Sequence, residues 1–327
     1  MARDTAQWFR DFGWQVASVS PVYEAWAGAV AADPATVALL ETLPEQHRQP
    51  PLVFAVASLL GARDHDAGIT DFLRSNAEAL AAELAARPMQ TNEPGRCAAL
   101  TAALAAIDGP VALLELGASA GLCLYPDRYS YDYSGHSLHP DDGPGAVTLT
   151  CTLGAGIEPP RRLPFVVMRS GVDLRPLDVT SPADAAWLGA LTWPGQHDRE
   201  SRVRGAIAIA RDDPPHLLQG DAESALDELL ALAPEGATPV IVTMGVLIYI
   251  PAPQRERLAE RIRASGARWV SLEGASVLPR VERQLRDAGW AEDELRGRFV
   301  LAVDEHPLAF SGAYGETLEA CALGAGA

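Results

Sequence analysis

The stretch that decides the fold runs from Pro110 to Leu122 and reads PVALLELGASAGL. Its first half, Val111 to Leu116, is a short apolar run, as found in strands that are buried on both faces of a parallel sheet. Its second half consists mostly of small residues, and Gly117 and Gly121 allow a tight turn. The stretch therefore predicts a buried strand that passes through a glycine-rich loop into a helix.

Further apolar runs of this kind follow along the chain, at residues 165–168, 216–218, 240–243, 269–272 and 299–303. Helical patterns separate several of them, notably at residues 222–232 and 254–264. A chain in which strands and helices alternate is typical of a doubly wound α/β domain. We therefore expect an α/β fold with a Rossmann-like, mostly parallel sheet.

The residues before this region show helical patterns only. Trp8, Phe12 and Val16 share one helix face, and Asp33-Pro34 is a typical helix start. We expect an all-helical N-terminal cap domain over residues 1–108 and the α/β domain over residues 109–327. Residues 125–163 are rich in Tyr, Gly and Pro and break the alternation, so we interpret them as an insertion that contains a hairpin.

The composition is that of a folded globular protein that does not bind nucleic acid. The 327 residues are 48% hydrophobic and carry a formal net charge of −17, which repels a phosphate backbone. The chain contains no Lys, which excludes a Walker A phosphate loop and a Schiff-base lysine. The basic residues are all Arg and are spread along the chain.

The sequence also predicts a cytoplasmic protein without a membrane partner. The N-terminal residues MARDTAQWFRDFG lack a signal-peptide stretch, and the apolar run from Val240 to Pro251 is too short to cross a bilayer. The four cysteines are widely separated and include no C-x-x-C pair. We therefore expect reduced thiols and neither a disulfide framework nor a zinc site.

Residues that could contact a ligand stand at or after the ends of the predicted strands in a regular order. Asp173 ends the second strand, Asp221 follows the third and Met244 ends the fourth. Because the carboxyl ends of parallel strands share one edge of a sheet, we expect these residues beside the Gly117 loop. The backbone N–H groups of that loop, with a helix N-terminus behind them, favour a carboxylate or phosphate ligand.

Taken together, these features resemble the S-adenosylmethionine-dependent methyltransferases of Rossmann-like fold. The resemblance implies S-adenosylmethionine as cofactor, with its methionine part enclosed by a loop of Glu115, Gly117, Ala118, Ser119 and Gly121. It further implies a ribose contact from Asp173 with Leu174 beside it, an adenine contact from Asp221 and Ala222, and a further cofactor contact from Met244. One departure is the 56 positions between Gly117 and Asp173, where about 20 is usual.

The chain also resembles, over most of its length, a bacterial family described as a domain of unknown function. The stretches that carry this resemblance are Arg48-Gln49-Pro50, Gln90-Thr91-Asn92-Glu93, Gly95-Arg96-Cys97, Glu115 to Leu124, Asp127-Arg128-Tyr129, Tyr131-Asp132-Tyr133 and Gly171-Val172-Asp173-Leu174. This resemblance implies no particular reaction.

A methyltransferase needs an acceptor site and, for an oxygen or nitrogen acceptor, a base that takes its proton. The candidate bases are Asp132, Tyr131, Glu93 and His306. We expect a small-molecule substrate, with contacts from Asn92, Arg96 and Tyr249. The alternative for Asn92 is a helix N-cap with Glu93 in the first turn.

Other functions stay open at this point. Residues 117–121 match G-x-S-x-G, the nucleophile elbow of α/β-hydrolases, with Ser119 as nucleophile. A binding or regulatory protein could keep the nucleotide fold without turnover. His136 and His139, with Asp141 and Asp142, could form a metal cluster, but their setting favours a polar loop, and we expect no metal.

Overall fold

The computed structural model describes residues 4–63, 68–90 and 92–321, and the chain packs into two compact units. The first unit combines Met1–Thr91 with Thr180–Arg204, and the second combines Asn92–Val179 with Gly205–Ala327. Packing thus assigns residues 92–108 to the unit that holds the sheet. The expected domain boundary at residue 108, and the capping role of the N-terminal helices, stay predictions.

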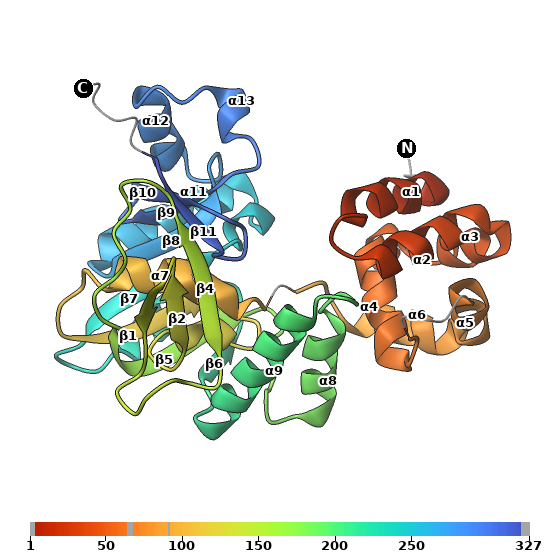
Figure 1. Cartoon of the computed structure of the whole chain (residues 1–327), viewed down its shortest axis with the longest axis horizontal. Coiled ribbons are helices and arrows are strands. Elements are labelled where there is room, and N and C mark those ends of the chain that lie inside the picture. The colour runs from red at the N-terminus through yellow and green to blue at the C-terminus, as the bar shows by residue number, and fades with distance from the viewer. Residues whose placement is uncertain (1–3, 64–67, 91, 322–327) are drawn as a thin grey trace. The chain divides into compact units, whose positions relative to one another are not determined.

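The first unit is helical, as the sequence predicts (Figure 1). Asp4 begins the first helix, because its side chain accepts a hydrogen bond from the Gln7 N–H at 2.8 Å. Phe9, Tyr23 and Phe54 are fully buried in its core. The elements are α1 (Thr5–Val16), α2 (Pro21–Ala32), α3 (Pro34–Glu41), η1 (Glu45–His47), α4 (Pro50–Leu60), α5 (Ile69–Ser75), α6 (Ala77–Ala86), α8 (Pro182–Ala190) and the first half of α9 (His197–Asp212).

The second unit is built on one sheet of eleven strands in the order β3-β2-β4-β11-β10-β9-β8-β7-β1-β5-β6. The strands are β1 (Pro110–Leu116), β2 (Ser130–Tyr133), β3 (His136–Leu138), β4 (Thr148–Leu153), β5 (Phe165–Asp173), β6 (His216–Gln219), β7 (Thr238–Met244), β8 (Arg268–Gly274), β9 (Phe299–Val303), β10 (His306–Ser311) and β11 (Thr317–Ala320). The helical elements are η2 (Pro94–Arg96), α7 (Cys97–Leu104), η3 (Leu122–Leu124), α10 (Leu226–Ala231), η4 (Leu247–Tyr249), α11 (Ala252–Ser265), α12 (Pro279–Asp287) and α13 (Glu292–Leu295).

Five adjacent strands, β6-β5-β1-β7-β8, are all parallel to their neighbours. From β1 the chain proceeds outward through β5 to β6, and then returns to the other side of β1 with β7 and β8. The direction of strand order therefore reverses between β1 and β7, which is the topological switch point where open α/β sheets bind ligands. Antiparallel β9 and β10 extend the sheet beyond β8, so the sheet is mixed and mostly parallel.

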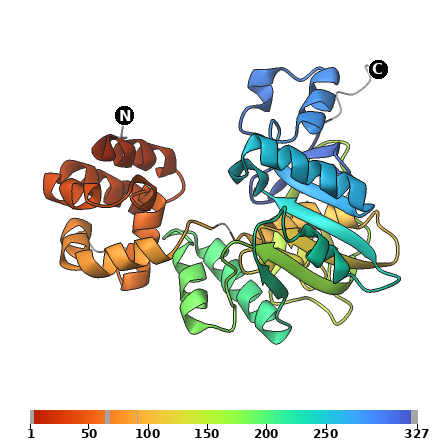
Figure 2. The same ribbon diagram turned by 180° about the vertical axis from the view of Figure 1, so that it is seen from behind.

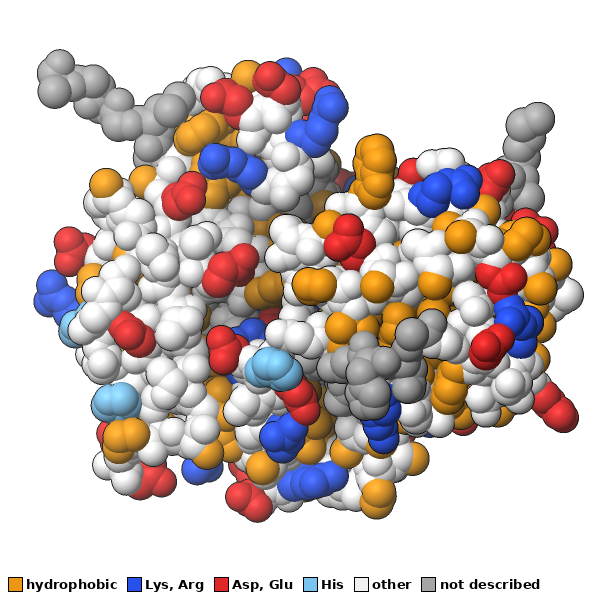
Figure 3. Space-filling view, turned by 45° about the vertical axis from the view of Figure 1, so that its right-hand side comes forward, with side chains coloured by type: hydrophobic (Ala, Val, Ile, Leu, Met, Phe, Trp, Pro, Cys, Tyr) orange, Lys and Arg blue, Asp and Glu red, His pale blue; other side chains and the backbone are white. Residues whose placement is uncertain are grey.

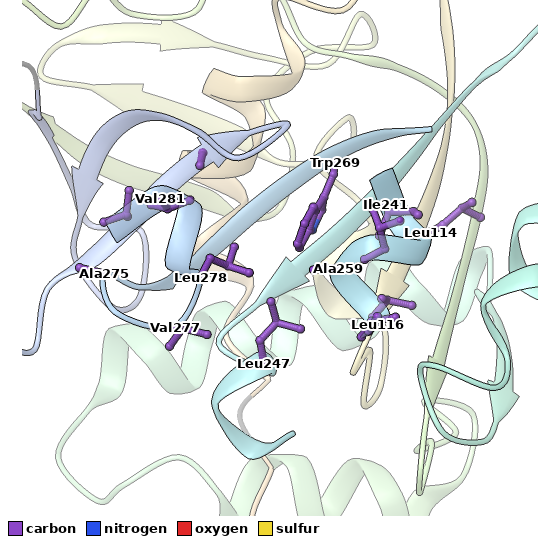
Figure 4. Close-up of a cluster of buried hydrophobic side chains, with 14 of the residues drawn as sticks. Leu114, Leu116, Ile241, Leu247, Ala259, Trp269, Ala275, Val277, Leu278 and Val281 are labelled. Atoms are coloured by element: carbon purple, nitrogen blue, oxygen red, sulfur yellow. The ribbon is translucent and has the colours of Figure 1, made fainter. Parts of the chain in front are cut away.

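Helices pack on both faces of the sheet. On one face, Leu114, Ile241 and Trp269 project from neighbouring strands into a core shared with α10, α11 and α12 (Figure 4). Figure 2 shows α11 lying across the strands on this face. On the other face, α7 contacts β8 and β9. A strand between two helical layers must be apolar on both sides, which explains the apolar run of Val111 to Leu116.

Residues 125–163 add strands to the sheet. β2 and β3 form the expected hairpin, which turns at Ser134 and Gly135. Tyr129, Tyr131 and Tyr133 are buried, and each hydroxyl donates a hydrogen bond to a backbone carbonyl at 2.6–2.7 Å. These tyrosines therefore pack the insertion against the rest of the unit.

The prediction of a helix directly after the glycine-rich loop is wrong. The loop leads into a single turn of 3-10 helix, η3, and no α-helix forms between Gly121 and β2 in the described chain. Gly121 has a φ of 70°, outside the helical region, and Pro126 disfavours helical backbone at Tyr125. The loop consequently has no helix dipole behind it.

No helix in the described part of the chain has the length and apolar character needed to cross a bilayer. On the face drawn in Figure 3, Arg side chains are interspersed with Asp and Glu.

Candidate functional site

The loop after β1 is held by its own backbone and by two side chains. The N–H groups of Gly117 and Ala118 both donate to the Val172 carbonyl in β5, at 2.8 and 3.1 Å. The Ser119 N–H donates to Asp173 Oδ2 at 2.9 Å, and the Ala120 N–H donates to Asn92 Oδ1 at 3.0 Å.

The last N–H of the loop, that of Gly121, donates to the Ala118 carbonyl at 2.7 Å. All five N–H groups from Gly117 to Gly121 are therefore used within the protein. The expectation that this loop cradles an anion is wrong, because it presents no free donors to a phosphate or carboxylate.

Asp173 lies directly beside the glycine-rich loop, as the sequence predicts. Besides the Ser119 N–H, its carboxylate accepts the Arg175 N–H at 2.8 Å. The side chain of Asn92 reaches the same loop from the segment before η2, and its amide also donates to Ser119 Oγ at 2.6 Å. Asn92 thus links the segment before η2 to the glycine-rich loop. The alternative role for Asn92, a helix N-cap, is filled by Glu93, whose side chain accepts the Gly95 N–H at 2.9 Å.

The loop after β7 meets the loop after β1 across the switch point. A Cβ atom placed on Gly117 would lie 2.3 Å from a methyl carbon of Val246, and Gly117 has a φ of 75°. A Cβ on Gly245 would lie 3.1 Å from an Arg96 nitrogen. The two glycines therefore permit close packing between these loops, with Arg96 alongside.

Glu115 is a buried acid in β1 whose Oε2 has no hydrogen-bond partner among the described residues. Burial raises the pKa of Glu115 well above its ordinary value. Cys123 and Asp173 act in the same direction, while Arg96 lowers the pKa.

Glu273, the penultimate residue of β8, is a second buried acid of this kind. Its Oε1 accepts the N–H groups of Val246 and Leu247 at 3.1 and 3.3 Å, and its Oε2 has no partner in the described chain. Burial raises the pKa of Glu273 to about 7, against the opposing effects of those N–H groups and of Arg96. Sequence reasoning missed Glu273, although a charged residue directly after the apolar run 269–272 was a usable signal.

Arg96 supplies positive charge between these acids. Its guanidinium donates to the Met244 carbonyl at 2.7 Å and to the Ala313 carbonyl at 3.0 Å, and the side chain is buried. One guanidinium therefore acts on two buried carboxyls, which lie near the ends of β1 and β8 on either side of β7. Buried acids with raised pKa values and few partners are typical of functional sites.

The other predicted cofactor residues lie at the same edge of the sheet. Asp221 caps the turn after β6, since its carboxylate accepts the N–H groups of Glu223 and Ser224, and it also accepts from the Gln254 amide at 3.1 Å. Ala222 follows it and is half-buried. Met244 is buried at the end of β7, and Leu174 is 68% exposed after β5.

The candidate bases are not brought together. Glu93 lies at the edge, because its carbonyl accepts the Cys123 thiol near Glu115. The Tyr131 hydroxyl is buried and donates to the Pro126 carbonyl, and Asp132 accepts the N–H of Gly135 in the hairpin turn.

His306 belongs to the opposite edge of the sheet. It follows Asp304, which accepts the Trp269 N–H at the start of β8. The Asp304–Glu305 pair forms a tight turn with positive φ angles. From Trp269 to Gly274 a strand covers about 16 Å, so His306 lies far from the carboxyl ends.

The other candidate sites lack the groups that their chemistry requires. The hydroxyl of Ser119 accepts the Asn92 amide, and no histidine side chain contacts it in the described chain. His139 bonds Ser130 Oγ at 3.0 Å, and His136, Asp141 and Asp142 are exposed. Within the described residues, no group of three or more His, Cys, Asp or Glu side chains has a metal-binding arrangement.

A cavity of about 240 Å³ lies near the amino end of β6, apart from the switch point. Its lining includes Tyr125, Arg128, Asp142, Asp212 and Asp213. The carboxyl edge therefore remains the candidate functional site.

A family model described as "Uncharacterized protein conserved in bacteria (DUF2332)" matches residues 6–311. The chain belongs to this family. The match spans both units, as the sequence resemblance predicts. No curated protein and no solved structure matches the chain.

Substitution of Gly117 tests the contact between the two loops. Gly117→Ala adds a methyl group to the space of Val246, whereas Gly109→Ala has a similar φ of 79° and no atom within 4 Å of its Cβ. Both variants carry the cost of a positive φ, and we expect Gly117→Ala to lose about 1–3 kcal/mol more in urea unfolding. Equal losses in the two variants would contradict the close approach of Val246.

The buried acids predict a pH-dependent stability. A raised pKa in the folded state contributes stability that is complete below the unfolded value of 4.5 and is lost as pH rises to about 7 for Glu273. Glu273→Gln keeps the oxygen that accepts both N–H groups and removes the titration. We expect its unfolding free energy, relative to the wild type, to rise by about 2–3 kcal/mol between pH 5 and pH 8. The matched variant is Glu260→Gln on an exposed position of α11, whose difference from the wild type should stay constant.

Proposed function

We propose that this protein binds S-adenosylmethionine at the carboxyl ends of β1, β5, β6 and β7 and transfers its methyl group to a small molecule. The observation that carries the proposal is the juxtaposition at the switch point. There the glycine-rich loop contacts Asp173, with the buried acids Glu115 and Glu273 near Arg96. Ligands of open α/β sheets bind at this position.

The charge of the site favours a cationic nucleoside over a phosphorylated one. The loop N–H groups are all used internally, so the site lacks the cradle that a dinucleotide pyrophosphate requires. Carboxyl groups stand at or just after the ends of β1, β5, β6 and β8. S-adenosylmethionine has no phosphate and carries a positive sulfonium, which fits this acidic edge.

The residues present can hold each part of this ligand. Each oxygen of Asp173 accepts one N–H, and a carboxylate offers about four acceptor positions, so both can still accept ribose hydroxyls. Asp221 and Ala222 would contact the adenine. The free Oε2 of Glu115 and the guanidinium of Arg96 suit the sulfonium and the carboxylate of the methionine part.

When bound, S-adenosylmethionine supplies an electrophilic methyl group. The chain has to orient the acceptor in line with it, exclude water and accept a proton from an oxygen or nitrogen nucleophile. Exposed apolar side chains at this edge, Leu174, Ile248 and Tyr249, offer a surface for the acceptor. Of the four bases named from the sequence, the placement of Glu93 supports such a role best, and Asn92 and Arg96 would help to form the acceptor site.

A non-catalytic nucleotide-binding or regulatory role is the second candidate. It is favoured by the packing of Val246 onto Gly117, which fills space that a ligand would need, and by the engagement of Glu93 in a cap. Hydrolysis by Ser119 has less support, since its hydroxyl accepts from the Asn92 amide and contacts no base among the described residues. We also propose a cytoplasmic location, because the four cysteines are buried free thiols.

Calorimetry with S-adenosylmethionine tests the proposal. We expect the wild type to bind it and to bind neither NADH nor ATP. Asp173→Ala should lose about 1.5–3 kcal/mol of binding free energy, the value of hydrogen bonds to a charged group. Asp287→Ala, on an exposed position of α12, is the control and should bind as the wild type does. Failure of the wild type to bind S-adenosylmethionine would exclude this function.

A further inference from the structure

The acids at the carboxyl edge fall into two classes. Asp173 and Asp221 have each carboxylate oxygen engaged by a backbone N–H or an amide of the chain. Glu115 and Glu273 are both at least nine-tenths buried, and each keeps one oxygen without a hydrogen-bond partner among the described residues. Asp173 and Asp221 are thus satisfied by the fold, and Glu115 and Glu273 are not.

Arg96 cannot compensate both of these buried acids. Its guanidinium donates to the carbonyls of Met244 and Ala313, and it lowers the pKa of both carboxyls only partly. A buried carboxylate without a complete set of partners is costly, so the fold retains these groups at the expense of stability. A ligand that brings its own positive charge would remove that cost.

We infer that Glu115 and Glu273 determine ligand selectivity at this edge, where their incompletely satisfied carboxyl groups take a cationic ligand and give up protons as it binds. This inference rests on the proposed function. It predicts that the site prefers the sulfonium form of the ligand over the neutral thioether product. The thioether forms when the methyl group bonds to the acceptor and the electron pair of the broken carbon–sulfur bond stays on sulfur.

The groups around each acid fix the direction of the pH effect. Cys123, Asp173 and Arg96 act on Glu115, and Glu273 is affected by Arg96 and by the N–H groups of the loop after β7. An added cation lowers the pKa of a nearby carboxyl. Binding therefore releases protons, and affinity rises with pH around the value of about 7 for Glu273.

The matched pair of S-adenosylmethionine and S-adenosylhomocysteine isolates this effect, because the two differ by one methyl group and one positive charge. We expect calorimetry to show an affinity for S-adenosylmethionine that rises about tenfold from pH 6 to pH 8, the factor for one pKa unit. The affinity for S-adenosylhomocysteine should change less than about twofold. Titrations in phosphate and in Tris, which differ in ionisation enthalpy, should show proton release for the sulfonium ligand only.

Variants assign the effect to the two acids. Glu273→Gln, which keeps the oxygen for the Val246 and Leu247 N–H groups, should lose most of the pH dependence, and Glu115→Gln should weaken the preference for the sulfonium ligand. Glu260→Gln should retain both.

The outcomes separate this inference from the proposed function. Binding of S-adenosylmethionine without proton release, or with the same pH dependence as its product, overturns the inference and leaves the proposed function standing. Absence of binding overturns both. If a variant fails to fold, the presence or absence of proton release by the wild type on binding S-adenosylmethionine still tests the inference.

Discussion

The carboxyl groups buried at the ends of β1 and β8 impose the constraint that shapes this part of the molecule. Glu115 and Glu273 lie within the last two residues of their strands, where water is excluded. Among the described residues, Arg96 lowers the pKa of both carboxyls, and backbone N–H groups of the loop after β7 donate to Glu273. The close packing of Gly245 against Arg96 follows from this arrangement.

A second set of contacts holds the neighbouring loop in place. Asp173 and Asn92 bind the backbone of Ser119 and Ala120 from opposite segments of the chain. These side chains supply the acceptors for the Ser119 and Ala120 N–H groups, and the loop is held without an α-helix behind it. The same contacts engage the N–H groups of Ser119 and Ala120, so these groups are not free to bind a ligand.

Periodicity and strand-end chemistry predicted much of this architecture. The apolar runs at Val111 to Leu116 and at residues 240–243 are strands, and Asp173 lies beside the loop. The missing helix after Gly121 was not predictable from the G-x-x-x-G spacing alone, since it depends on a left-handed Gly121 and on the contacts of η3.

The rest of the site depends on packing between segments that are distant in the sequence, so it could not be predicted from the sequence. His306 was separated from the site by the length of β8, which only the pairing of β8 with β9 reveals. Glu273 looked like the polar end of a strand, and its importance depends on the loop from β7 that folds over it. A buried and unsatisfied carboxyl has no sequence signature of its own, because burial is a property of the assembled sheet.

The most direct measurement is a crystal structure of the protein grown with S-adenosylmethionine. We expect ligand density between the ends of β1 and β7, with the ribose at Asp173, the methionine part at Glu115 and Arg96, and Val246 moved away from Gly117. Density elsewhere, or an unchanged contact between Val246 and Gly117 at saturating ligand, would contradict this expectation.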